Sequence, residues 1–179
     1  VANADAALVL TTRERAEAFV PLLDGAPPKL LLLDGGDGRD DDYETQLACA
    51  SDRFEPVAVQ RDEVAVLHYT SGSSGTLKAA MQTFGNRLAQ LRKFLMRGEG
   101  GRDGDVLGLV GPITHASGMQ LVPALCSGTT IRLFRGFDPD RWLHEMHAQR
   151  VTHTFLVPTM IHTLIEAQEQ RSRPLPDLR

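Results

Sequence analysis

The chain reads VAVLHYTSGSSGTLK from Val64 to Lys78, and this stretch decides the fold class. Its first six residues, Val64 to Tyr69, are mostly apolar and of strand length, which predicts a β-strand. Residues 70–78 are rich in Ser, Thr and Gly, and a helical pattern follows from about Gly85 to Met96. A strand, a glycine-rich loop and a helix in this order are typical of α/β sheets, in which ligands bind beyond the carboxyl ends of the strands. We therefore predict that residues 70–78 form a ligand-binding loop between a central strand and a helix.

The composition of this loop suits the polyphosphate of a nucleotide. Glycines let backbone amides approach a ligand closely, and successive amides form an anion-binding concavity. The hydroxyl groups and Lys78 add further hydrogen-bond donors and a positive charge. A flexible linker is the alternative, but linkers are not usually flanked by a strand and a helix. The Walker phosphate loop is excluded, because Gly75 is followed by Thr-Leu-Lys-Ala rather than by Lys and a hydroxylated residue.

Strands and helices alternate on both sides of the loop. Residues 1–62 read as a β-α-β unit, whose helix begins with a capping-box pattern at Thr11–Glu14, and an aspartate-rich loop at 34–42 follows. The continuous apolar run at 29–33 is typical of a strand buried on both faces. Residues 63–179 read as an α/β subdomain, with a helix start at Asp138-Pro139. This order of elements predicts an α/β fold with a mainly parallel sheet flanked by helices.

Composition narrows the function classes. The 179 residues are 42% hydrophobic and carry a formal net charge of −4, so a folded domain is expected and nonspecific nucleic-acid binding is not. No apolar run reaches the length of about 18 residues that a membrane span needs. The two cysteines are too few for a disulfide framework. A cytoplasmic protein without a membrane span or a nucleic-acid partner is the resulting expectation.

Two clusters invite a metal-binding interpretation, and neither supports it. The aspartate-rich stretch at 34–42 lacks the alternating ligands and final Glu of a calcium loop, so a solvated loop is expected. His144 and His147 lie three residues apart in a predicted helix, with His153 nearby, but no Cys or carboxylate pattern completes a zinc site. We expect no metal-ligating residues in this chain.

The run from Tyr69 to Lys78 resembles the phosphate-loop signature Y-T-S-G-[ST]-T-G-x-P-K-G of the adenylate-forming superfamily, which includes acyl-CoA synthetases. Ser74, Leu77 and Ala79 depart from that signature, and none of the three changes removes a phosphate-binding group. Thr83 and Asn86 also match the family pattern. Further stretches then follow in the family's order, at residues 111–118, 128–131, 137–139, 151–152 and 157–160.

The resemblance implies a two-step ligase. In that family a carboxylate attacks the α-phosphorus of ATP and releases pyrophosphate, and a thiol, usually that of coenzyme A, then displaces AMP. It implies that His115 helps to position the acyl carboxylate, as a second catalytic residue beside Lys78. It also implies ATP, Mg²⁺ and coenzyme A or a carrier thiol as ligands. The ATP phosphates would be held by Thr70, Ser71, Gly72, Ser73, Ser74, Gly75, Thr76 and Lys78.

The same resemblance places several parts of the family's active site after Arg179. These are the Y-G-x-T-E segment for adenine and Mg²⁺, the ribose-binding Asp, and the C-terminal domain with a second lysine. The chain is therefore expected to be a fragment of the large N-terminal domain, inactive without the remainder of its own parent chain. Two alternatives remain open. An amino-acid adenylation domain usually has an Asp within the stretch matching residues 115–118, where this chain has His-Ala-Ser-Gly. A non-catalytic binding module is the other.

Overall fold

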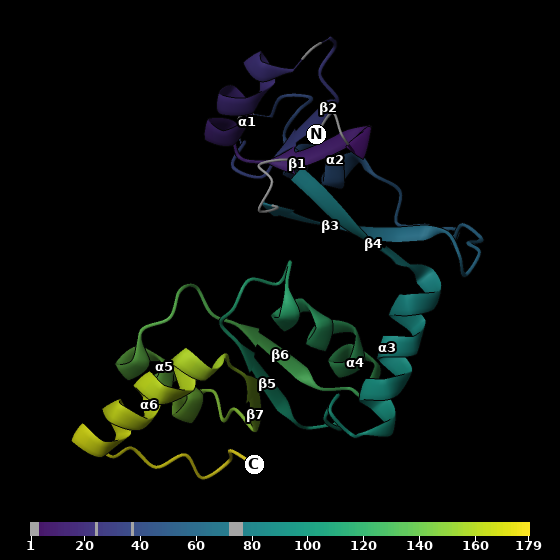
Figure 1. Ribbon diagram of the computed structural model, residues 1–179. Helices are drawn as coiled ribbons and strands as arrows, with labels where there is room; N and C mark the ends of the chain where they lie inside the picture. The colour runs from purple at the N-terminus through teal and green to yellow at the C-terminus, as the bar shows by residue number, and fades with distance from the viewer. Residues whose placement is uncertain (1–3, 24, 37, 72–76) are drawn as a thin grey trace. The chain divides into compact units, whose positions relative to one another are not determined.

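The computed structural model describes residues 4–23, 25–36, 38–71 and 77–179. The chain divides into two compact units that are not contiguous in sequence. The first comprises Val1–Val59 with Leu67–Ala80, and the second comprises Gln60–Val66 with Met81–Arg179. Figure 1 shows the elements of both units.

The first unit contains a parallel strand pair, as its sequence predicts. Strands β1 (Leu8–Thr11) and β2 (Lys29–Leu32) pair in parallel, and helix α1 (Arg13–Phe19) with the 3₁₀ helix η2 (Val20–Leu22) connects them. The strands are not buried on both faces, since Leu8, Leu10 and Leu33 are all exposed. The expectation of full burial for the run at 29–33 is therefore wrong for the described residues.

The ends of the helices in this unit differ from the prediction. Thr12 precedes α1 but makes no side-chain capping bond, so the predicted capping box is absent. The amide of Arg13 instead donates to the carboxylate of Asp34 at 2.8 Å. The aspartate-rich stretch also leads into an unpredicted helix, α2 (Tyr43–Cys49). Its preceding residue Asp42 is buried and accepts a hydrogen bond from the Thr45 hydroxyl at 2.6 Å.

Two strands, rather than one strand and a helix, flank the glycine-rich segment. Strand β3 (Val64–Ser71) pairs with strand β4 (Leu77–Thr83), and helix α3 (Phe84–Met96) follows directly. Thr83 and Asn86 form a reciprocal capping box: the Asn86 amide donates to the Thr83 hydroxyl at 3.2 Å, and the Thr83 amide donates to the Asn86 side-chain oxygen at 3.0 Å. These two residues therefore fix the start of α3.

The second unit contains a three-stranded parallel sheet with helices on both faces. The strand order is β6 (Thr130–Leu133), β5 (Val106–Leu109) and β7 (His153–Phe155), with β5 in the centre. The 3₁₀ helix η3 (Ala116–Gln120) and helix α4 (Leu121–Cys126) connect β5 to β6, helix α5 (Pro139–Ala148) connects β6 to β7, and helix α6 (Pro158–Gln170) follows β7. This arrangement confirms the predicted fold class, an α/β fold with parallel strands flanked by helices (Figure 1).

Side chains that alternate along β5 build a core on each face of this sheet. Leu107 and Leu109 pack with Ala124 of α4 on one face. The other face belongs to α5 and α6, where Trp142 is the largest buried side chain. Gly108 lies under this indole, and a Cβ at that position would be 3.1 Å from its ring and 3.1 Å from Val151.

Candidate functional site

The residues expected to bind phosphate flank the end of β3 and the start of β4. Thr70 and Ser71 are the last two residues of β3, and residues 72–76 lie outside the described residues. Lys78 is the second residue of β4 and is exposed. The expectation that residues 70–78 form a loop that joins a strand to a helix is wrong, because β4 begins at Leu77 and its residues 79–83 lie between Lys78 and α3. The assignment of Thr70–Thr76 and Lys78 to ATP phosphates stays a prediction.

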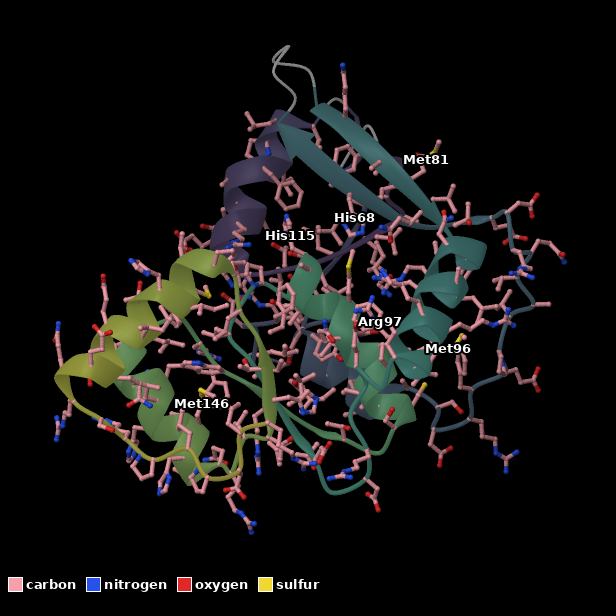
Figure 2. All side chains as sticks on the ribbon, turned by 60° about the horizontal axis from the view of Figure 1, so that its bottom comes forward. His68, Met81, Met96, Arg97, His115 and Met146 are labelled. Atoms are coloured by element: carbon pink, nitrogen blue, oxygen red, sulfur yellow. The ribbon has the colours of Figure 1, made fainter. Side chains whose placement is uncertain are left out.

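His115 lies in the turn that follows the central strand of the second unit, as the sequence predicts. It is exposed, and it immediately precedes η3 (Figure 2). Its amide donates to the Pro112 carbonyl at 3.1 Å, and its own carbonyl accepts from the Gly118 amide at 3.0 Å. The Thr114 hydroxyl lies 2.9 Å from Nδ1 of the imidazole, which leaves Nε2 available to a ligand. Lys78 belongs to the first unit and His115 to the second.

Close backbone packing holds this turn in shape. A Cβ at Gly118 would lie 2.7 Å from the carbonyl carbon of Ile113 and nearer still to its oxygen. Likewise, a Cβ at Gly111 would collide with the hydroxyl of Ser117, which is itself buried. Only glycine fits at position 118 in this conformation, and a side chain at position 111 would require the Ser117 hydroxyl to turn away. The backbone therefore fixes where His115 is presented.

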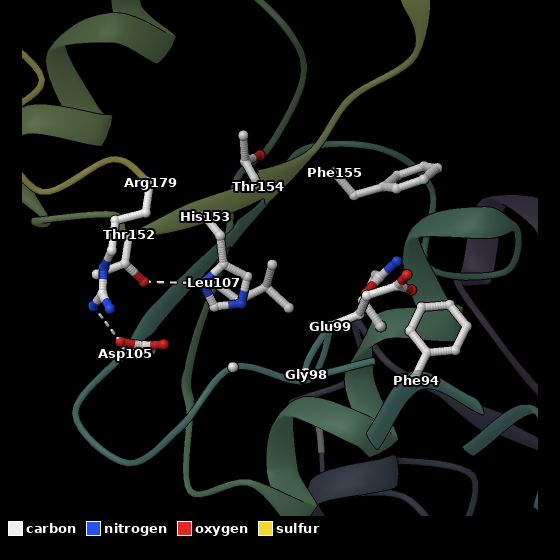
Figure 3. A pocket seen from close by; sticks show the side chains of 12 residues that line it. Phe94, Gly98, Glu99, Asp105, Leu107, Thr152, His153, Thr154, Phe155 and Arg179 are labelled. Carbon is white, nitrogen blue, oxygen red and sulfur yellow. Dashed lines mark hydrogen bonds and ion pairs between the residues drawn. The ribbon is translucent and has the colours of Figure 1, made fainter. Parts of the chain in front are cut away.

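A cavity of about 540 Å³ lies on the α4 face of the sheet. Figure 3 shows Phe94 and Phe155 toward one end, the Asp105–Arg179 ion pair toward the other, and His153 between them. The Arg179 Nη2 and Asp105 Oδ1 atoms of that pair are 2.5 Å apart. Gln120 also lines the cavity. It is the last residue of η3, the short helix that begins directly after His115.

His153 is the titratable group inside the cavity, and its surroundings favour the neutral imidazole. Burial lowers its pKa below the ordinary value of 6.5; the Asp105 carboxylate acts in the opposite direction, and the Arg179 guanidinium lowers the pKa further. Its Nδ1 is 2.9 Å from the Thr152 hydroxyl. Its Nε2 is buried and has no hydrogen-bond partner among the described residues.

The sequence did not identify this cavity. His153 appeared only as a possible metal ligand together with His144 and His147. In the structure His144 and His147 are exposed on α5, and Nδ1 of His147 is 3.0 Å from the Pro174 carbonyl oxygen. No group of three or more His, Cys, Asp or Glu side chains forms a metal site within the part of the chain that the structure describes. A His in a strand beside a hydroxylated residue was the only local signal, and it is a weak one.

The chain thus combines parallel strands flanked by helices with a glycine- and serine-rich segment after β3 and a histidine turn after β5. The family described as AMP-binding enzyme matches residues 1–179. The chain belongs to that family.

Relatives of similar sequence support the same family assignment. Feruloyl-CoA synthase of an Amycolatopsis species is 33% identical over 181 residues, which cover 100% of this chain and 34% of that protein. The 2-succinylbenzoate–CoA ligase of Bacillus velezensis is 32% identical over 180 residues, covering 94% of this chain and 36% of the ligase. Each match covers about a third of the relative's length.

Among solved structures, a long-chain-fatty-acid–CoA ligase from Archaeoglobus fulgidus matches 99% of this chain and 36% of its own, with a TM-score of 0.80 and 21% identity. Apo MatB from Rhodopseudomonas palustris matches 99% of this chain and 35% of its own, with a TM-score of 0.77 and 25% identity. The fold is therefore that of a segment of these ligases. Among the described residues no helix is long and apolar enough to cross a membrane.

Proposed function

We propose that this chain is the phosphate-binding and acid-positioning part of an AMP-forming acyl-CoA ligase. In the proposed reaction a carboxylate oxygen attacks the α-phosphorus of ATP, pyrophosphate leaves, and an acyl-AMP forms. The thiol of coenzyme A then attacks the acyl carbon and AMP leaves. The observation that carries the proposal is the family match over the whole chain, which includes both the segment at 70–78 and the histidine turn at 111–118.

The phosphate-binding role belongs to the segment between β3 and β4. Lys78 is exposed at the beginning of β4, where its flexible ammonium group can follow phosphate oxygens. The glycine amides and hydroxyl groups of residues 70–76 would donate to the β- and γ-phosphates, whose charge changes as the bond to the α-phosphate breaks. Mg²⁺ would be bound by the ATP phosphates and by the segment that the resemblance places after Arg179.

The acid-positioning role belongs to His115. Its Nδ1 is occupied by the Thr114 hydroxyl at 2.9 Å, so Nε2 is the nitrogen that remains for the substrate carboxylate. The rigid turn between Gly111 and Gly118 would present this nitrogen in one position, which orients the acid for attack. The relatives are named for feruloyl and 2-succinylbenzoate thioesters, both of which contain an aromatic ring. We therefore propose a carboxylic acid with an aromatic ring as the substrate.

The CoA ligases among the relatives favour this function over the adenylation of an amino acid. The full-length enzyme would be assayed for acid-dependent exchange of labelled pyrophosphate into ATP, and for acyl-CoA by mass spectrometry. Exchange with aromatic acids and formation of the thioester are expected. Exchange supported by amino acids, but by no simple carboxylic acid, would contradict the proposal.

The 179-residue chain alone is expected to give no exchange, since the resemblance assigns the adenine, ribose and second-lysine contacts to other residues. Activity of the pure chain with ATP and an acid would show that it contains a complete adenylation site.

A further inference from the structure

We propose that the hydroxyl of Thr114 donates its proton to Nδ1 of His115, which fixes the neutral imidazole as a hydrogen-bond donor through Nε2–H. In this arrangement Nε2–H donates to one oxygen of the substrate carboxylate, and the other oxygen stays free to attack the α-phosphorus of ATP. Thr114 is then a positioning residue that acts through His115. This inference rests on the proposed function and specifies how its acid-positioning residue is prepared.

The Thr114 hydroxyl is free to give its proton to the imidazole. Its oxygen lies 2.9 Å from Nδ1 of His115, and both residues are exposed in the turn that follows β5. A threonine hydroxyl has one proton and rotates to reach an acceptor. Among the residues that the structure describes, Nδ1 is the only hydrogen-bond partner of this hydroxyl. No carbonyl of the turn therefore competes for the proton.

The other Thr-His pair of the chain shows the effect of a proton that is committed elsewhere. Thr-His occurs at 114–115 and at 152–153, and in both pairs the hydroxyl oxygen is 2.9 Å from Nδ1. The Thr152 hydroxyl accepts from the Val106 amide at 3.0 Å and donates its proton to the Val106 carbonyl at 3.1 Å. It has only a lone pair left for His153, whose Nδ1–H must donate. Thr114 has no such commitments, so the same two-residue sequence supports the opposite tautomer at His115.

The donor form of Nε2 is the one that a carboxylate requires. An ionised carboxylate has only acceptor sites, so an imidazole with its proton on Nδ1 would turn a lone pair toward it. A neutral Nε2–H binds the carboxylate without an opposing charge, and the carboxylate keeps the negative charge with which it attacks. The bond to Nδ1 also restricts rotation of the ring, so the turn between Gly111 and Gly118 determines where Nε2–H is directed.

Steady-state kinetics of the full-length enzyme, with cinnamate as the acid and both substrates varied, test this role. Thr114→Val removes the hydroxyl and should raise the KM for cinnamate by roughly three- to tenfold, the effect of one hydrogen bond, without changing the KM for ATP. Thr114→Ser keeps a hydroxyl and should behave like the unmodified enzyme. Thr163→Val is the matched control, because it removes a hydroxyl that donates to the Thr159 carbonyl at 3.0 Å on α6, and it should change neither KM.

Two further measurements separate an effect through His115 from a merely structural one. In a double-mutant cycle, Thr114→Val should have no further effect on the KM for cinnamate in the His115→Ala background. In enzyme with isotope-labelled histidine, at about pH 8 and above the range in which imidazoles usually titrate, proton–nitrogen correlation spectra should show the proton of His115 on Nε2. Thr114→Val should move part of the population to the Nδ1–H tautomer, and the spectrum of His115→Ala identifies the signals.

The outcomes distinguish this inference from the proposed function. A KM for cinnamate in Thr114→Val equal to that of Thr163→Val, an equal loss with and without His115, or a proton on Nδ1 of His115 would overturn the role of Thr114 while leaving the ligase assignment intact. If Thr114→Val does not fold, the spectrum of the unmodified enzyme still decides which nitrogen carries the proton. Absence of pyrophosphate exchange with every carboxylic acid would overturn the proposed function itself, whichever tautomer the spectrum shows.

Discussion

Replacing Gly118 with Ala should disrupt the turn that carries His115. The added Cβ would lie 2.7 Å from the carbonyl carbon of Ile113, and nearer still to its oxygen, whereas ordinary contacts begin near 3.4 Å. Because the opposing atoms are backbone, no side-chain rotation relieves the collision, and the turn must open. Overpacking at sites that can adjust costs about 1–3 kcal/mol, so we expect a loss near the upper end of that range, about 3 kcal/mol.

Urea unfolding followed by tryptophan fluorescence measures this loss. Trp142 is the only tryptophan in the 179-residue chain, and it is buried in the same unit as Gly118. With a denaturant dependence of about 1–3 kcal/mol per molar urea, the midpoint should fall by roughly 1–3 M. Ala116→Ser, an exposed change in the same segment, serves as the control and should leave the midpoint unchanged. A Gly118→Ala midpoint equal to that of the control would refute the packing argument.

Three other outcomes are expected. In the full-length enzyme, Lys78→Ala should lower ATP-dependent adenylation by roughly ten- to a hundredfold, which is the effect of a lost charged contact. His115→Ala should instead act mainly by raising the KM for the acid. Steady-state kinetics that showed the reverse pattern would exchange the two assignments. Thr83→Ala should destabilise the chain by about 1 kcal/mol through loss of the capping box, and calorimetry showing no change would contradict that role. Burial holds the pKa of His153 in the folded protein below 6.5, so the unfolded chain binds more protons at this residue than the folded protein does. The stability that the neutral imidazole contributes should therefore be complete above pH 6.5 and be lost as the pH falls toward the folded-state pKa. Urea midpoints measured across this pH range should show a slope that His153→Gln reduces, and an identical slope in that variant would exclude His153 as its source.

Much of the fold could be predicted because its signals are local. The Asp138-Pro139 pair marks the start of α5, and the Asp138 carboxylate accepts from the Arg141 amide at 2.8 Å as an N-cap should. The helix at Pro158–Gln170 begins at the predicted proline. Each of these signals lies within one helical turn of the structure that it specifies.

The errors occur where distant residues decide the structure. Leu77–Thr83 contains one Lys and two Ala, which are depleted in strands, yet it forms β4 through pairing with β3. The first amide of α1 bonds to Asp34, 21 residues further along, instead of to the adjacent Thr12. Neither partner is visible in a local pattern.

The candidate site likewise has a part that the sequence predicts and a part that only the structure reveals. The phosphate segment and the histidine turn are contiguous motifs, so the sequence alone is enough to nominate them. The cavity combines the end of α3, the start of β5 and the whole of β7, so that Phe94 and Phe155, 61 positions apart in the sequence, both line it. No spacing rule links these residues, and only the fold brings them and His153 into one cavity.

The absence of a side chain at Gly108 has a consequence for how this domain can change over time. The indole of Trp142 and the methyl groups of Val151 occupy the space that a larger residue at position 108 would need. Substitution of Gly108 alone is therefore disfavoured, and so is loss of the indole, which would leave a void beneath α5. A change to Ala at 108 becomes acceptable once a smaller residue stands at 142 or 151. The three positions are thus expected to exchange volume with one another, and a sequence from this lineage with a bulkier residue at 108 should carry a smaller one on α5 or before β7.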